Sequence, residues 1–217
     1  MPLTVLQMLH LADSALPVGG FAFSNGLEAA VKCGMIASRS DLERYLEDAI
    51  RQWIAFDGPF ITAFHASLCE EMLMRYDRML LSPTMRKASF SQGRGWLRVF
   101  EQIFPGTHPS VFRSALSALS IGPHYLPLFA NSLGTAGAGE QQVRELYFFT
   151  LLRDQMGAAV RLGLIGPGGA QAMQSRLEVL LHPQLMDCRD QPPRRFTPMM
   201  DIAQMLQPSL YTKLFQN

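Results

Sequence analysis

Apolar side chains recur every three or four residues over most of the chain, which is the spacing of helices that bury one face. The clearest run consists of Leu42, Tyr45, Leu46, Ala49, Ile50, Trp53 and Ile54. Few segments show the alternating pattern of a β-strand, and no fixed-period repeat indicates a solenoid. The sequence therefore predicts an all-α fold, a compact multi-helix bundle.

Capping residues and prolines divide this pattern into separate helices. Ser40 and Glu43 have the spacing of a capping box. They predict a helix that ends near 57–58, and Pro59 then opens a second helix to about Leu80, because a first-turn proline loses no hydrogen bond. Further helices are expected at residues 5–11, 26–33, 82–104, 109–119, 123–133, 140–162 and 170–181.

Composition limits the class of protein. Only 17% of the 217 residues are charged, against about 25% in a typical domain, so apolar side chains are expected on the surface. No apolar run reaches the ~18 residues of a membrane span, and no secretory leader is visible, which favours a cytoplasmic protein that does not bind membranes. A net charge of +1 gives no support for nucleic-acid binding.

The chain is expected to have three parts. Residues 1–181 form a helical core domain, and residues 182–197, with their prolines and charges, form a flexible linker. Residues 198–217 regain amphipathic character as a C-terminal tail. Such a tethered tail either docks on its own domain or folds onto a partner, and its pattern does not decide between these.

The usual catalytic signatures are absent. The chain contains neither the GxxxxGK[ST] loop of nucleotide hydrolases nor the GxSxG nucleophile motif. We therefore predict no catalytic residue and no stably bound cofactor, with a helical enzyme whose site is assembled from distant segments as the alternative. His65 and Cys69, four residues apart on an expected helix, are weak metal candidates. A half-buried histidine beside a core cysteine is the simpler interpretation.

The N-terminal region contains the most distinctive turn. Pro17, Gly19 and Gly20 allow a sharp backbone path. The turn would display Phe21 and Phe23 as interface side chains, although both rings could equally fill the core.

The residues that follow would begin a helix. Ser24 is a fair N-cap, Gly26 lies next to the start of the helix, and Glu28 falls in the first turns. Glu28 either meets a basic partner surface or only stabilises the helix dipole.

Two more positions suggest contacts. Arg161 lies in an apolar helix, where a charge needs a partner, so it either pairs with an acid of the core or contacts another protein. In the tail, Tyr211, Leu214 and Phe215 would share one face of a helix that could lie in a groove.

Four segments in order resemble the UreF-type urease accessory proteins. The first reads DSALPVGGFAFSNGLE and the second PHYLPLF. The third reads AAVRLGLIG, and the fourth is the tail with PMMDIA and LYTKLF. The resemblance spans nearly the whole chain.

The resemblance implies a dimeric, non-enzymatic scaffold. Such proteins bridge a UreD/UreH-type accessory protein and the UreG-type GTPase, and they help deliver nickel to apo-urease. GTP would be bound by the GTPase, whose activity the scaffold would modulate, and nickel would only pass through the complex. The resemblance also favours a tail that docks on the UreD/UreH-type partner, and a GTPase contact at Arg161 stays open beside an internal ion pair.

Overall fold

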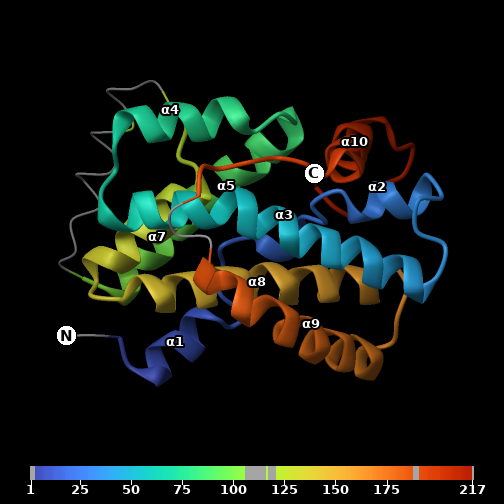
Figure 1. The fold of residues 1–217 in the computed structure, drawn as a ribbon, viewed down its shortest axis with the longest axis horizontal. Helices are drawn as coiled ribbons and strands as arrows, with labels where there is room; N and C mark the ends of the chain where they lie inside the picture. The colour runs from blue at the N-terminus through green and yellow to red at the C-terminus, as the bar shows by residue number, and fades with distance from the viewer. Residues whose placement is uncertain (1–2, 106–115, 117–120, 188–190, 217) are drawn as a thin grey trace.

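The computed structural model describes residues 3–105, 116, 121–187 and 191–216, and in these ranges the regular structure is helical, as predicted (Figure 1). The longer helices are α3 (Arg39–Ala66), α5 (Pro83–Ile103), α8 (Glu140–Arg161) and α9 (Pro167–Asp187). The shorter ones are α1 (Val5–Leu11), α2 (Leu27–Lys32), α4 (Glu70–Met79), α7 (Tyr125–Thr135), α10 (Pro198–Leu206) and the 3-10 turns η1 (Gly20–Ala22) and η2 (Gln207–Ser209). The helix expected at 109–119 falls almost entirely outside the described residues.

Helix α3 crosses the centre of the bundle and packs against α7, α8 and α9 (Figure 1). Its capping box is formed by Ser38 and Asp41, so the predicted start at Ser40 and Glu43 is wrong by two residues. The predicted break before Pro59 is also wrong, because the helix continues through this residue to Ala66.

Contacts from elsewhere in the chain compensate for Pro59 inside α3. A proline lacks the N–H that would bind the carbonyl four residues earlier, here that of Ala55. The N–H of Arg194 donates to this carbonyl at 3.0 Å instead. The Ala55 carbonyl, left without a helical donor, thus binds the segment that leads to the tail.

Helices α3 and α8 are joined by a fully buried arginine. The Arg144 guanidinium donates to the Gly58 carbonyl at 3.0 Å and to the Thr62 hydroxyl, and it pairs with Glu140 at 2.6 Å. A buried charge of this kind is stable only because it is paired and hydrogen-bonded. Aromatic rings fill the space on the other side of α3, where Phe56, Phe60 and Phe64 pack around Tyr76.

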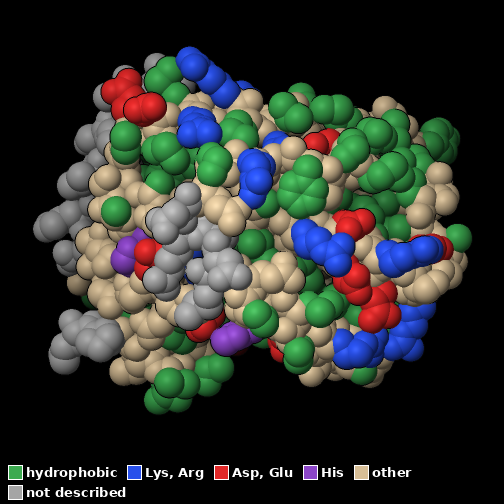
Figure 2. All heavy atoms as spheres, in the orientation of Figure 1, with side chains coloured by type: hydrophobic (Ala, Val, Ile, Leu, Met, Phe, Trp, Pro, Cys, Tyr) green, Lys and Arg blue, Asp and Glu red, His purple; other side chains and the backbone are tan. Residues whose placement is uncertain are grey.

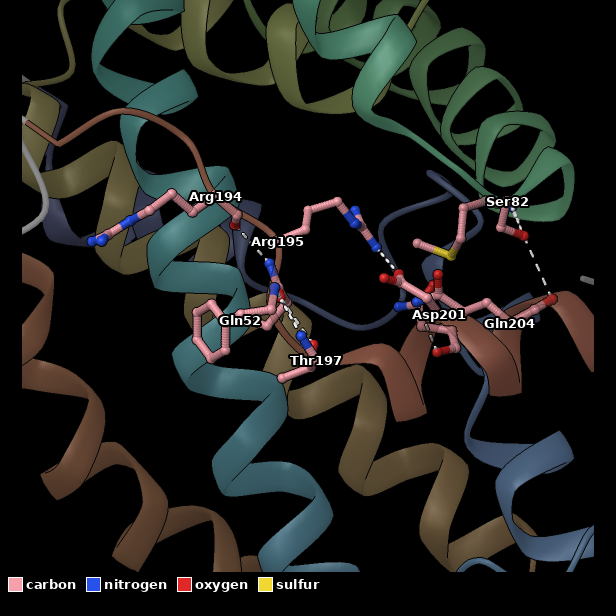
Figure 3. A network of polar contacts seen from close by, with 10 residues as sticks. Gln52, Ser82, Arg194, Arg195, Thr197, Asp201 and Gln204 are labelled. Atoms are coloured by element: carbon pink, nitrogen blue, oxygen red, sulfur yellow. Dashed lines mark hydrogen bonds and ion pairs between the residues drawn. The ribbon is translucent and has the colours of Figure 1, made fainter.

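The expected linker at 182–197 is partly helical, because α9 runs on to Asp187 instead of ending at residue 181. Residues 191–197, here called the connecting segment, lie along α3 (Figure 3). The side-chain amide of Gln52 accepts the N–H groups of Phe196 at 2.7 Å and Thr197 at 3.1 Å, and it donates to the Arg194 carbonyl at 2.9 Å. The flexibility of this linker stays a prediction.

Helix α10 packs against α2 and α5, so the tail lies on its own domain in this structure (Figure 1). Arg195 fixes the start of α10 by pairing with Asp201, while its guanidinium lies 4.8 Å from the centre of the Phe56 ring. Gln204 accepts a hydrogen bond from Ser82, the N-cap of α5, at its main-chain oxygen (Figure 3). None of the described helices is both long and apolar enough to cross a membrane.

Candidate interaction site

The predicted turn at Pro17–Gly20 forms, and it depends on glycine. Pro17 and Gly19 are exposed, and Gly19 has a φ of 91° just before η1. At Gly20 an added Cβ would lie 2.3 Å from a carboxylate oxygen of Asp154, so a larger residue would push this turn away from α8. Gly26, at φ 92°, makes a similarly close approach to Gln204 of α10.

The two phenylalanines after the turn have different environments. Phe21 is 58% exposed, which is consistent with an interface role, while Phe23 is 5% exposed and belongs to the core. The prediction that both rings are displayed is therefore wrong for Phe23. A turn has no regular periodicity, so the spacing of Phe21 and Phe23 in the sequence could not indicate which of the two rings is buried.

Ser24 and Glu28 are both completely buried, which the sequence did not indicate. The N-cap of α2 is Gly26, so Ser24 does not take the predicted position, although its hydroxyl accepts the N–H of Glu28 at 3.4 Å. Of the two roles left open for Glu28, direct exposure to a partner does not hold in this structure, because the chain's own tail covers this carboxylate.

Glu28 is the centre of the contact between the tail and α2. Its carboxylate accepts the N–H groups of Leu214 at 2.7 Å and Phe215 at 3.3 Å, and the side-chain amide of Gln207 at 2.7 Å. Lys32 pairs with it at 2.9 Å. Burial alone would raise the pKa of Glu28, but these hydrogen bonds and the charge of Lys32 outweigh burial and lower it.

Arg161 joins the turn to the end of the tail. Its guanidinium lies between two rings, 3.6 Å from the centre of Phe21 and 4.1 Å from that of Phe215, and it donates to the Phe21 carbonyl at 2.6 Å. Stacking of this kind stabilises a cation by about 0.5–2 kcal/mol. The expected ion pair with a core acid is thus replaced by two rings and main-chain oxygens, although Asp154 acts on Arg161 through its charge.

The tail residues predicted to share a helical face do not do so. Helix α10 ends at Leu206 and η2 at Ser209, and the remaining chain is irregular. Phe215 is buried, whereas Tyr211 is fully exposed and Leu214 is 63% exposed. Pro208 has no N–H with which to continue the helix, and further along the chain the N–H groups of Leu214 and Phe215 bind Glu28.

Two small, partly open cavities have volumes of about 70 Å³ and about 60 Å³, and both are lined in part by Asn25, Gln92, Tyr125 and Leu151. The first contains Asp57, and the second contains Asp154. Burial raises the pKa of Asp57 to about 7, although Arg195 opposes the shift. Burial also raises the pKa of Asp154, against the opposing charge of Arg153.

The weak metal candidates do not form a site. Cys69 is the N-cap of α4 and lies beyond the end of α3, so it does not share a helix with His65 as predicted. A ring nitrogen of His65 lies 2.9 Å from the carbonyl oxygen of Ala138. In the described part of the chain, no group of three or more His, Cys, Asp or Glu side chains could hold a metal ion.

Among the surfaces that expose apolar side chains, two have at least three such residues close together in sequence. One is on α1, where Val5, Leu6 and Leu9 are each at least 63% exposed. The other, here called the α10 face, comprises Phe196, Met199, Ile202 and Met205, and Figure 2 shows hydrophobic side chains gathered over this helix. Large exposed apolar surfaces of this kind usually mark protein interfaces.

Three important residues were missed at the sequence level: Gln52, Gln207 and Asp57. Each is buried, and each acts through a long-range contact or a cavity. Glutamines and aspartates in a helical pattern normally indicate a solvated face. The proline four residues after Ala55 was the only local sign that α3 needed another donor nearby.

Comparison with known proteins identifies clear relatives. Residues 36–178 match the UreF family. The chain is 30% identical to urease accessory protein F of Arabidopsis thaliana, over 95% of this chain and 90% of the relative. It is 29% identical to urease accessory protein UreF of a Mycobacterium species, over 92% of each chain.

Replacement of Glu28 tests its role in holding the tail. We expect Glu28→Gln to cost about 2–3 kcal/mol of unfolding free energy at pH 7, because a neutral amide cannot accept the same hydrogen bonds. In a chain shortened to end at residue 206 the same replacement should cost less than about 1 kcal/mol. Urea denaturation of the four proteins measures this coupling, with Glu47→Gln as the control.

The pH dependence of this effect has a definite sign. Since the pKa of Glu28 is lower in the folded protein, the ionised carboxylate stabilises the fold fully above the ordinary value of 4.5, and this stabilisation is lost as the pH falls through the folded-state pKa.

In the truncation test, an equal cost of Glu28→Gln in the full and shortened chains would contradict the proposed contact between Glu28 and the tail.

Asp57 should destabilise the folded protein at high pH. Its pKa rises from 3.8 to about 7 on folding, so stability falls as the pH rises between these values. The shift corresponds to a loss on the order of 4 kcal/mol. We expect Asp57→Asn to be more stable than the parent in urea at pH 8 and to lose this advantage toward pH 4. The exposed Asp48→Asn is the control, and an Asp57→Asn protein of parental stability at pH 8 would show that the site is well solvated.

Proposed function

Because the chain belongs to the UreF family of urease accessory proteins, we propose that it is the scaffold that bridges a UreD/UreH-type accessory protein and the UreG-type GTPase. Membership gives it a role in urease maturation, together with other accessory proteins and urease, and not an enzymatic activity of its own. In the proposed role it helps deliver nickel to apo-urease in the cytoplasm and modulates the GTPase, which carries the GTP. Neither nucleic acid nor a membrane takes part.

The α10 face carries the proposal for the UreD/UreH-type partner. Its four side chains are each at least 44% exposed, and three of them, Met199, Ile202 and Met205, belong to a helix that buries Met200 and Ala203 against the core. Tyr211 and Leu214 add further exposed apolar area in the tail. Fixing this helix beforehand through Glu28 and Gln52 would lower the entropic cost of binding.

The exposed stripe on α1 supports a homodimer. A two-fold interface uses the same patch on both copies, and Val5, Leu6 and Leu9 offer such a patch. The α10 face would then stay free for the second partner in each copy.

The turn around Phe21 is the proposed contact for the GTPase. Pro17, Gly19 and Phe21 are exposed, and Arg161 stacks on the Phe21 ring. The turn therefore presents an aromatic ring and a positive charge together. Aromatic side chains and arginines are common at the centres of interfaces. Stronger contacts with one nucleotide state of the GTPase would shift its equilibrium toward that state.

Nickel is cargo in this proposal and not a resident cofactor. The two small cavities share lining residues and carry carboxyl groups, Asp57 and Asp154. Such polar interior space is consistent with passage of a hydrated cation through the complex.

Removal of the tail tests the bridge. Co-expression of the chain with and without residues 198–217, followed by pull-down, should show loss of the UreD/UreH-type protein from the shortened chain. The GTPase is assayed separately, because loss of Phe215 also removes one of the two rings stacked on Arg161 beside the proposed GTPase contact. Equal capture of the UreD/UreH-type protein by both chains would refute the assignment of the tail.

A further inference from the structure

A second feature lies beside the α10 face: a groove between the end of α4 and the connecting segment. Its floor is apolar and includes Met79, Leu81 and Phe196. Arg78 and Arg194 line it as well, and both are exposed. Figure 2 shows Lys and Arg side chains over α4 and hydrophobic side chains over α10 beside it.

Two of the arginines that line this groove, Arg78 and Arg194, have no acidic partner among the described residues, whereas the third, Arg195, pairs with Asp201. In the described part of the chain Arg78 forms no ion pair, and the side chain of Arg194 binds only the neutral side chain of Gln191. Two acids close to these arginines in sequence are already engaged, since Asp77 pairs with Arg86 at 3.2 Å and Asp201 pairs with Arg195. The groove is therefore apolar inside and positively charged at its edge.

The groove is continuous with the α10 face. Phe196 belongs to both, and Leu81 precedes Ser82, whose hydroxyl lies 3.5 Å from the main-chain oxygen of Gln204 in α10 (Figure 3). The connecting segment is fixed here by Gln52, so the groove has a defined wall. A partner that covers α10 would reach the groove without a gap.

We propose that this groove binds a segment of the UreD/UreH-type partner in which apolar side chains alternate with carboxylates. The proposal rests on the proposed function for the identity of the partner, and on the groove for its chemistry. Apolar side chains would cover Leu81 and Phe196, and carboxylates would pair with Arg78 and Arg194. Charge pairs at the edge of an interface mainly speed association and fix orientation, and they weaken with salt.

Binding of the purified partner to the full chain tests this, by biolayer interferometry at about 50 mM and about 300 mM NaCl. Arg78→Glu combined with Arg194→Glu should weaken binding by about tenfold at low salt and flatten the salt dependence. Leu81→Ser should weaken binding at both salt concentrations. The controls are Arg44→Glu on α3, whose side chain is 74% exposed, and Val179→Ser on α9, where 72% of the residue is exposed.

The outcomes separate the two proposals. Failure of the unmodified chain to bind this partner overturns the proposed function and the groove assignment with it. Unchanged affinity in both variants, while the parent binds, overturns the groove alone. A change only in the oligomeric state of the variants would assign the groove to a second copy of the chain and also overturn the proposal. If a variant unfolds by circular dichroism, the salt dependence of the parent decides, and salt-independent binding rejects the charged edge.

Discussion

A single buried carboxylate joins helix α2 to the C-terminal tail. Glu28 lies near the start of α2, and its oxygens accept main-chain N–H groups from residues 214 and 215. A buried carboxylate is costly unless its oxygens are hydrogen-bonded, so the tail and Glu28 depend on each other. Arg161 continues the contact by stacking between Phe21 of the N-terminal turn and Phe215 of the tail. The turn, the long helix α8 and the tail thereby form one connected surface.

The segment that precedes the tail is held by hydrogen bonds to α3. Pro59 leaves the Ala55 carbonyl of α3 without its helical donor, and Arg194 supplies the missing N–H. Gln52, one turn earlier, binds the next part of the connecting segment through its side-chain amide. Helix α10 is thus held at both ends, which leaves its outer apolar stripe presented in a fixed position. Less chain then has to be ordered when another protein binds this stripe, which lowers the entropic cost of binding.

Much of the fold could be predicted from the sequence, because amphipathic spacing reports directly which face of a helix is buried. The starts of α5 at Ser82–Pro83 and of α8 near Glu140 follow from local capping and glycine signals. The course of α3 through Pro59 could not be predicted, since it depends on an N–H group that lies 139 positions further along the chain from Ala55. Part of the candidate interaction site could also be predicted from the sequence. The turn residues and Arg161 were found, but the burial of Glu28 and Phe23 depends on a tail whose position no local pattern encodes.

The central claim is that the tail lies on its own domain through Glu28 before any partner binds. Hydrogen exchange of the amides of Leu214 and Phe215 in the isolated full-length protein tests it most directly, because both N–H groups donate to the buried carboxylate. The account predicts that these amides exchange at least about 100-fold more slowly than in an unstructured peptide. Exchange at the unstructured rate would contradict it and would show that the tail becomes ordered only on a partner.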